Sequence, residues 1–206
     1  MTLIIGFTGK KRSGKDTAAS IMRELADLNG LTAERAAFAD PLKDELAEIV
    51  SHGLRLHKVN TTPLSDSVLW QVIRHEMDDP DTKHKYRLGL QWWGTEIRRA
   101  IDPDYWLRRM QEAIESLEDD GPVHLLTVTD VRFQNEADFI HRLGGIVYRV
   151  DRPGLPDDDT HASEVEINKV TVDGVIRNDK DLSYLRVLVR YRFDTYTKPR
   201  LLNEDN

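Results

Sequence analysis

The apolar residues of this chain follow two patterns, short unbroken runs and longer stretches with helical spacing. Residues 2–8 (TLIIGFT) form a β-branched apolar run that leads into a glycine, which predicts a buried strand. Apolar residues then recur every three or four positions between 18 and 28. This spacing predicts a helix that Asn29-Gly30 would end.

Both patterns continue along the rest of the chain. Strands that alternate with helices predict an α/β fold, with a mostly parallel sheet flanked by helices on both faces. The second strand is the weakest and is expected to end at Asp40-Pro41. The later strands are expected at 33–40, 123–130, 146–150 and 173–179, and the later helices at about 42–50, 87–100, 104–118, 136–143 and 181–196.

Residues 52–86 are charged and irregular. One interpretation is a solvated loop with some helix. The other is a mobile lid or an acceptor-binding insertion, because long excursions in compact domains are often functional. We expect one domain over 1–206, with an insertion or lid and acceptor-binding region over about 52–108.

The helix expected over 87–100 has two distinct faces. Leu90, Trp93 and Ile97 form an apolar stripe, so we expect Trp93 in the core. Gly94 lacks a side chain, which would let a ligand or a neighbouring backbone approach closely. A second, polar stripe consists of Arg87, Gln91, Thr95 and Arg98.

Composition narrows the class of protein. The chain has 206 residues, a formal net charge of −7 and no cysteine. The negative charge disfavours a general nucleic-acid coat, and the lack of cysteine excludes disulfides and thiolate metal sites. The sequence shows neither a secretory signal nor an apolar run of roughly 20 residues. These features predict a cytoplasmic protein that binds neither nucleic acid nor membranes.

Gly9, Gly14 and Lys15 have the G-x-x-x-x-G-K spacing of a phosphate-binding loop, directly after the first predicted strand. Such a loop points backbone N–H groups at one anion, and the helix that follows adds its positive end. Lys15 would reach the β- and γ-phosphates of a nucleoside triphosphate. The spacing and its context therefore predict nucleotide binding.

Asp16 stands where Ser or Thr is usual, and Thr17 follows one position late. Asp16 still offers oxygen to Mg²⁺, directly or through water, and Thr17 could hydrogen-bond the α-phosphate. Nucleoside monophosphate kinases of the adenylate kinase type carry Gly-Thr after their lysine. The displaced Thr therefore favours a small-molecule kinase over a damaged loop.

Lys10, Lys11 and Arg12 add three positive charges to the loop. In a kinase, one or two of them can lie between donor and acceptor phosphates and stabilise the transition state. The alternative is that at least one simply faces solvent, Arg12 in particular.

Asp130 and Arg132 lie where the strand 123–130 ends, at the sheet edge that binds ligands in open α/β proteins. The acid could hold Mg²⁺ or orient an acceptor, and the arginine could bind a phosphate through two nitrogens. The alternatives are a helix N-cap for Asp130 and a surface salt bridge for Arg132.

Eight short segments occur in an order that resembles bacteriophage deoxynucleoside monophosphate kinases, over roughly residues 3–190. The loop and the segment TDVR also resemble phosphomevalonate kinase. The segments are GKKRSGKDT (9–17), FADPLK (38–43), LQWWGTEIRR (90–99), DPDYW (102–106), TDVRFQNEA (129–137), VDRPG (150–154), HASE (161–164) and VIRND (175–179).

The resemblance implies a P-loop kinase fold, transfer of the ATP γ-phosphate to a dNMP, Mg²⁺ as cofactor, and a homodimer. It implies that Lys15, Arg132 and Lys11 are catalytic, and that His161 is structural. The implied metal contacts are Asp16, Thr17 and Asp130. The implied ATP contacts are Gly9, Arg12, Ser13, Gly14, Lys15, Asp16, Thr17 and Asn178, the last near the adenine. The implied dNMP contacts are Lys10, Lys43, Arg87, Gln91, Trp92, Thr95, Glu96, Asp130, Arg132 and Glu136.

Three other functions stay open at this point. A kinase of another phosphorylated metabolite would share the architecture. A non-catalytic, nucleotide-gated binding protein would need no second anion site, so Arg132 and the polar stripe count against it. A nucleic-acid motor is disfavoured by the acidic charge and the small size.

Overall fold

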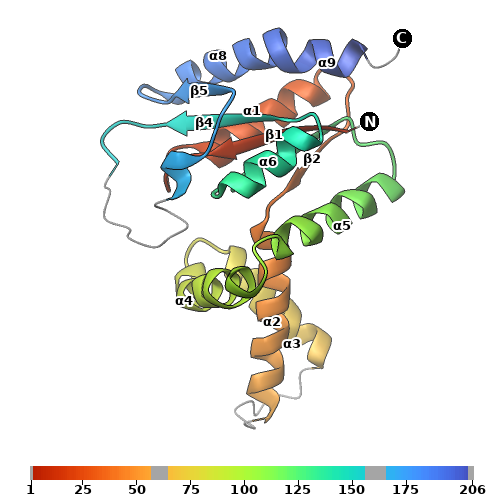
Figure 1. Ribbon diagram of the computed structural model, residues 1–206, viewed down its shortest axis with the longest axis vertical. Helices are drawn as coiled ribbons and strands as arrows, with labels where there is room; N and C mark the ends of the chain where they lie inside the picture. The colour runs from red at the N-terminus through yellow and green to blue at the C-terminus, as the bar shows by residue number, and fades with distance from the viewer. Residues whose placement is uncertain (1, 57–64, 156–165, 204–206) are drawn as a thin grey trace. The chain divides into compact units, whose positions relative to one another are not determined.

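In the computed structural model, five parallel strands form one sheet in the order β2-β3-β1-β4-β5 (Figure 1). The strand that carries the phosphate-binding sequence is therefore central, with β3 on one side and β4 on the other. This arrangement confirms the predicted α/β class with a parallel sheet. The strands are β1 (Leu3–Thr8), β2 (Ala33–Ala36), β3 (Leu125–Val128), β4 (Ile146–Asp151) and β5 (Gly174–Arg177).

The structure describes residues 2–56, 65–155 and 166–203, and these divide into two units. The first unit, 1–37 and 110–206, holds the sheet, and the second comprises Phe38–Arg109. The first contains α1 (Lys15–Asp27), α6 (Gln134–Arg142), η3 (Glu166–Lys169), α8 (Leu182–Arg192), η4 (Phe193–Thr197) and α9 (Lys198–Asn203). The second contains α2 (Ala39–Leu56), α3 (Asp66–Asp78), η1 (Lys83–Tyr86), α4 (Arg87–Gln91) and η2 (Trp92–Arg99), and α5 (Tyr105–Asp119) crosses the boundary.

Helices cover both faces of the sheet. Successive side chains of β1 point to opposite faces, and each face packs against its own helices. Ile5 and Phe7 are fully buried in a core that α1 and α8 complete. Gly6 faces the other way, where a Cβ atom would lie 2.7 Å from Ile140 Cδ1 on α6. Figure 1 shows α8 on one side of the sheet and α6 on the other. The bare backbone of Gly6 thus allows α6 to approach the central strand.

The second unit has its own apolar core, in which α3 packs against α2. Leu69, Ile73 and Met77 of α3 are buried against Leu46 of α2. The described part of 52–86 is therefore mainly helical, which contradicts the interpretation of a solvated loop with some helix, and the alternative of a lid or acceptor-binding insertion stays untested. The side chain of Trp93 packs against this core, as expected from the apolar stripe.

Two element boundaries also differ from the prediction. The second strand ends at Ala36, and Asp40 and Pro41 lie in the first turn of α2. Proline is tolerated there because a first-turn N–H has no partner within the helix. Among the described residues, no helix combines the length and apolar character needed to cross a membrane.

Candidate active site

The phosphate loop, residues 9–17, has the backbone conformation that its glycines permit. Gly9 and Gly14 have φ angles of 139° and 101°, and Arg12 between them has φ 66°. A Cβ atom on Gly9 would lie 2.3 Å from the carbonyl oxygen of Val150, so a side chain there would collide with β4. Positive φ at a residue other than glycine is uncommon and concentrates at functional sites. The loop is thus tightly wound against β4.

Lys15 begins α1 and folds back over the loop. Its Nζ donates hydrogen bonds to the carbonyl oxygens of Gly9 at 2.7 Å and Lys10 at 2.9 Å. The ammonium group therefore lies at the centre of the turn, where its charge would neutralise a bound phosphate. Lys11 and Arg12 are exposed, and Lys10 is half-buried.

Asp16 and Thr17 both lie exposed in the first turn of α1. A carboxylate at this position interacts favourably with the positive end of the helix. Both side chains offer oxygen, the ligand that Mg²⁺ prefers. Within the described ranges, no group of three or more His, Cys, Asp or Glu residues is placed to hold a metal ion. The metal assignment of Asp16, Thr17 and Asp130 stays a prediction.

Asn178, the residue after β5, holds the phosphate loop through a side-chain hydrogen bond. Its Nδ2 donates to the carbonyl oxygen of Ser13 at 2.8 Å, and its own backbone N–H donates to the carbonyl of Asp151 at 2.7 Å. A Cβ atom on Gly14 would lie 2.6 Å from the same Nδ2. The resemblance implied an adenine contact for Asn178. Its described contacts tie the end of β5 to the middle of the phosphate loop, and the predicted adenine contact stays untested.

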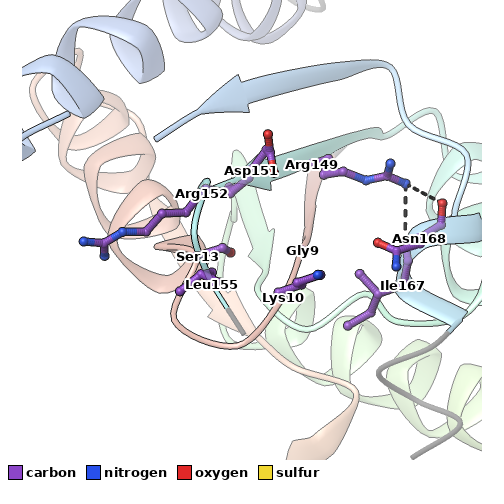
Figure 2. A pocket seen from close by; sticks show the side chains of 10 residues that line it. Gly9, Lys10, Ser13, Arg149, Asp151, Arg152, Leu155, Ile167 and Asn168 are labelled. Atoms are coloured by element: carbon purple, nitrogen blue, oxygen red, sulfur yellow. Dashed lines mark hydrogen bonds between the residues drawn. The ribbon is translucent and has the colours of Figure 1, made fainter. Parts of the chain in front are cut away.

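A pocket lies beside the loop at the carboxyl end of β4 (Figure 2). Figure 2 shows Arg149 reaching from β4 toward η3, where its Nη2 donates to the carbonyls of Ile167 and Asn168 at 3.3 Å and of Val170 at 2.8 Å. These bonds attach η3 to β4, the strand that pairs with β1. The pocket is lined by Gly9, Lys10, Ser13, Arg149, Val150, Asp151, Arg152, Leu155, Ile167 and Asn168.

Three buried polar atoms around the loop have no hydrogen-bond partner among the described residues. They are Thr8 Oγ1, Ser13 Oγ and Arg149 Nε. Thr8 and Arg149 are partners in the register of β1 and β4, and Ser13 and Arg149 line the pocket. Buried polar atoms are nearly always paired in native proteins. All three can donate, so an acceptor-rich ligand such as a phosphate suits them.

Asp130 and Arg132 lie just beyond β3, next to the start of the phosphate loop. Between them, Val131 donates its N–H to the carbonyl of Phe7 at 3.2 Å, which attaches this segment to β1. Glu136 Oε2 accepts from the N–H groups of Arg132 at 2.7 Å and Phe133 at 3.1 Å. Glu136 is only 2% exposed. These bonds account for its burial as a helix-capping residue, and its predicted dNMP contact stays untested.

The other predicted dNMP residues belong to the second unit. Lys43 forms ion pairs with Asp78 at 2.6 Å and with Asp40 at 3.6 Å, so its charge is balanced within this unit. Trp92 and Glu96 are exposed on one side of η2. Half-buried positions are occupied by Arg87, Gln91 and Thr95.

Sequence reasoning missed the β4 side of the site. Arg149 and Arg152 flank the end of a buried strand, the same signal that drew attention to Asp130 and Arg132. Recognising them required the strand order, because only the pairing of β4 with β1 brings them to the loop. His161, predicted to be structural, lies outside the described residues.

Comparisons with known proteins agree on one family. Residues 71–189 match the family model described as deoxynucleotide monophosphate kinase. A protein of Acanthamoeba polyphaga mimivirus named "Putative deoxynucleotide monophosphate kinase" is 32% identical over 192 residues, covering 87% of this chain and 90% of the viral protein.

Two solved kinases show weaker similarity. One is APS kinase of Mycobacterium tuberculosis in complex with AMPPNP and APS, with 13% identity, a TM-score of 0.46, and coverage of 94% of this chain and 98% of that one. The other is a sugar kinase from Janibacter sp. HTCC2649, with 16% identity, a TM-score of 0.46, and coverage of 96% and 98%. Similarity at this level carries no information about the substrate.

Proposed function

Because the chain belongs to the deoxynucleotide monophosphate kinase family, we propose that it transfers the γ-phosphate of ATP to a deoxynucleoside monophosphate, giving the diphosphate and ADP. Membership makes the chain a phosphotransferase. The observation that carries the proposal is the loop, in which Lys15 Nζ lies over the carbonyls of Gly9 and Lys10 at the start of α1. A triphosphate placed there meets backbone N–H groups, a helix N-terminus and an ammonium group together.

The proposed reaction needs no general base with a strongly shifted pKa. The acceptor is a phosphate group that is already largely ionised near neutral pH, so alignment and charge neutralisation supply most of the catalysis. In the proposal, Lys15 neutralises the transferred phosphoryl group. Arg132 and Lys11 stabilise the charge that spreads between donor and acceptor, and Lys10 contacts the acceptor phosphate.

Two further parts of the proposal concern groups at the rim of the loop. Asp16 and Thr17 are exposed oxygen donors at the start of α1, and this fits Mg²⁺, which keeps several waters and phosphate ligands. Bound Mg²⁺ would shield the charge of the triphosphate. For Asn178 we propose that its first role is to support the loop, with any adenine contact secondary.

We propose that the second unit carries six of the ten dNMP-recognition residues implied by the resemblance, namely Lys43, Arg87, Gln91, Trp92, Thr95 and Glu96. Trp92 and Glu96 have the exposure that a nucleotide contact requires. The acceptor base and the homodimer stay predictions.

A coupled assay of ADP release with ATP, Mg²⁺ and a panel of dNMPs and NMPs tests the proposal. We expect release that depends on a dNMP. Turnover with only a non-nucleotide acceptor would instead indicate a metabolite kinase, and nucleotide binding without acceptor-dependent release would indicate a gated binding protein.

Replacement of the loop lysine provides a second test. We expect Lys15→Ala to abolish transfer while the far-UV circular dichroism spectrum stays unchanged. Lys85→Ala is the matched control, since that side chain is 54% exposed and far along the chain from the loop. Near-normal turnover of Lys15→Ala would refute the assignment of the loop.

A further inference from the structure

One carboxylate of the second unit binds three other side chains. Glu45 Oε2 on α2 accepts from Trp93 Nε1 at 2.9 Å and from Arg98 Nε at 3.0 Å, and Oε1 accepts from the Tyr105 hydroxyl. The Glu45 side chain is 15% exposed, so these donors replace most of its water. Burial and the bond to Glu45 raise the pKa of Tyr105 above its ordinary value. Glu45 thus joins α2 to η2 and to the start of α5.

The helix geometry explains how two residues of η2 reach the same oxygen. Trp93 and Arg98 are five positions apart, whereas neighbours on one face of an α-helix are three or four apart. Residues Trp92–Arg99 form a π-helix, whose i→i+5 hydrogen bonds bring such residues onto one face. The Arg98 guanidinium also lies 4.7 Å from the centre of the Trp93 ring and 4.6 Å from that of Tyr105. Arg98 therefore leaves the predicted polar stripe, which assumed α-helical spacing.

Gly94, the residue after Trp93 in η2, provides a second attachment of this helix to its neighbours. A Cβ atom on Gly94 would lie 2.7 Å from Leu42 Cδ2, so Gly94 admits a side chain of α2 and not a ligand or a backbone. Trp106 Nε1 donates to the buried carbonyl of Gly94 at 2.9 Å. Trp92 and Glu96 are left exposed. The attachments therefore determine which residues of η2 face solvent.

We propose that Glu45 is a positioning residue for the dNMP acceptor, which acts by fixing the rotation of η2 so that Trp92 and Glu96 face outward. The inference rests on the proposed function, in which those two residues contact the dNMP. Without the carboxylate, Arg98 would be a half-buried cation without this partner. Trp93 and Arg98 of the π-helix would both lose the oxygen that accepts their hydrogen bonds. Rotation of η2 would then misplace the dNMP contacts and leave the phosphate loop unchanged.

Steady-state kinetics of Glu45→Gln tests this role. The amide keeps the shape of the side chain but cannot accept from all three donors. We expect the KM for the dNMP to rise about tenfold or more, the range expected when charge-assisted hydrogen bonds are lost. The KM for ATP should stay within about twofold, because the substitution leaves the residues assigned to ATP unchanged. Glu48→Gln, an exposed residue three positions along α2, is the matched control and should behave as wild type.

Single-donor variants keep the test valid if Glu45→Gln folds poorly. Trp93→Phe removes only the indole N–H and keeps a ring for Arg98, and Tyr105→Phe removes only the hydroxyl. Each should raise the KM for the dNMP by a smaller factor, and combining either with Glu45→Gln should add little, because both act through the same carboxylate.

The outcomes separate this inference from the proposed function. Wild-type protein without dNMP-dependent ADP release refutes the proposed function, and the inference with it. Active wild type with an unchanged dNMP KM in Glu45→Gln and in both single-donor variants refutes the inference alone. It is also refuted if both KM values and the urea midpoint change together in all three variants, because that pattern indicates a general loss of structure.

Discussion

The bond between Asn178 and the phosphate loop makes a quantitative prediction. In Asn178→Ala, the carbonyl of Ser13 loses the hydrogen bond that the Asn178 amide donates. This bond is buried, since Asn178 is only 9% exposed. Removing one partner of a buried hydrogen bond costs about 1–3 kcal/mol, since the remaining group keeps its desolvation penalty. With a urea slope of about 2 kcal/mol/M, the unfolding midpoint should fall by about 0.5–1.5 M.

The assay is urea unfolding followed by far-UV circular dichroism, together with the KM for ATP. All four tryptophans lie between residues 70 and 106, so tryptophan fluorescence reports separately on the second unit. We expect the dichroism midpoint of Asn178→Ala to fall. The KM for ATP should rise because the loop is no longer held in its binding conformation.

Asn29→Ala is a control with the same chemistry in a different environment. The Asn29 amide also donates to a backbone carbonyl, that of Leu25 at 2.7 Å, but Asn29 is exposed and water can replace it. Its loss should cost about 0.5 kcal/mol or less. Equal destabilisation by the two substitutions, with the KM for ATP unchanged in both, would show that Asn178 does not support the loop.

Substitutions at three other positions have definite expected results. Gly94→Ala adds a Cβ atom 2.7 Å from Leu42 Cδ2 and should destabilise the protein by about 1–3 kcal/mol through overpacking, measured by tryptophan fluorescence in urea; an unchanged midpoint would contradict this. Glu136→Ala leaves two backbone N–H groups without their acceptor and should cost about 1–3 kcal/mol by dichroism, whereas Glu136→Gln, which retains an acceptor, should cost less. Burial raises the pKa of Tyr148 to about 12, so the folded state keeps a proton that the unfolded state loses above pH 10. Stability is therefore complete below pH 10 and falls as pH rises toward 12. Tyr148→Phe should gain about 1.4 kcal/mol relative to wild type between pH 9 and pH 11, and parallel pH profiles would refute the reasoning.

The phosphate loop was predictable because its information is local. The spacing of Gly9, Gly14 and Lys15 and the apolar run before them specify strand, turn and helix within fifteen residues or so. The parallel sheet followed from the alternation of strands with helices. Local patterns sufficed wherever neighbouring residues determine the conformation.

The sequence also contains the pattern of helix α3, although no helix was assigned to these residues. Leu69, Ile73 and Met77 recur every four residues, and Ser65 before them accepts from the N–H of Val68 as an N-cap. The charges interspersed among them suggested a loop. In the structure these charges form ion pairs on the surface of the helix, such as Arg74 with Asp44 at 2.6 Å.

The contacts of Glu45 and Arg149 could not be predicted from local patterns. The carboxylate that accepts from Trp93 and Arg98 lies 48 residues before Trp93, and an α-helical template assigned Arg98 to the wrong face. Arg149 reaches the loop only because β4 pairs with β1, a pairing that skips over β2 and β3 in the chain. Both depend on long-range packing, which periodicity does not contain.

The central position of β1 has a mechanical consequence. Lys15 is tied to this strand through the short loop that follows it. Arg132 is tied to the same strand because its neighbour Val131 bonds to Phe7, and because Ile140 of the following helix rests on Gly6. A displacement of β1 would carry both cations with it. Both groups are therefore attached to one strand, and we expect the spacing between these two cations, which the proposal places at the transferred phosphate, to change little when the sheet moves as one body.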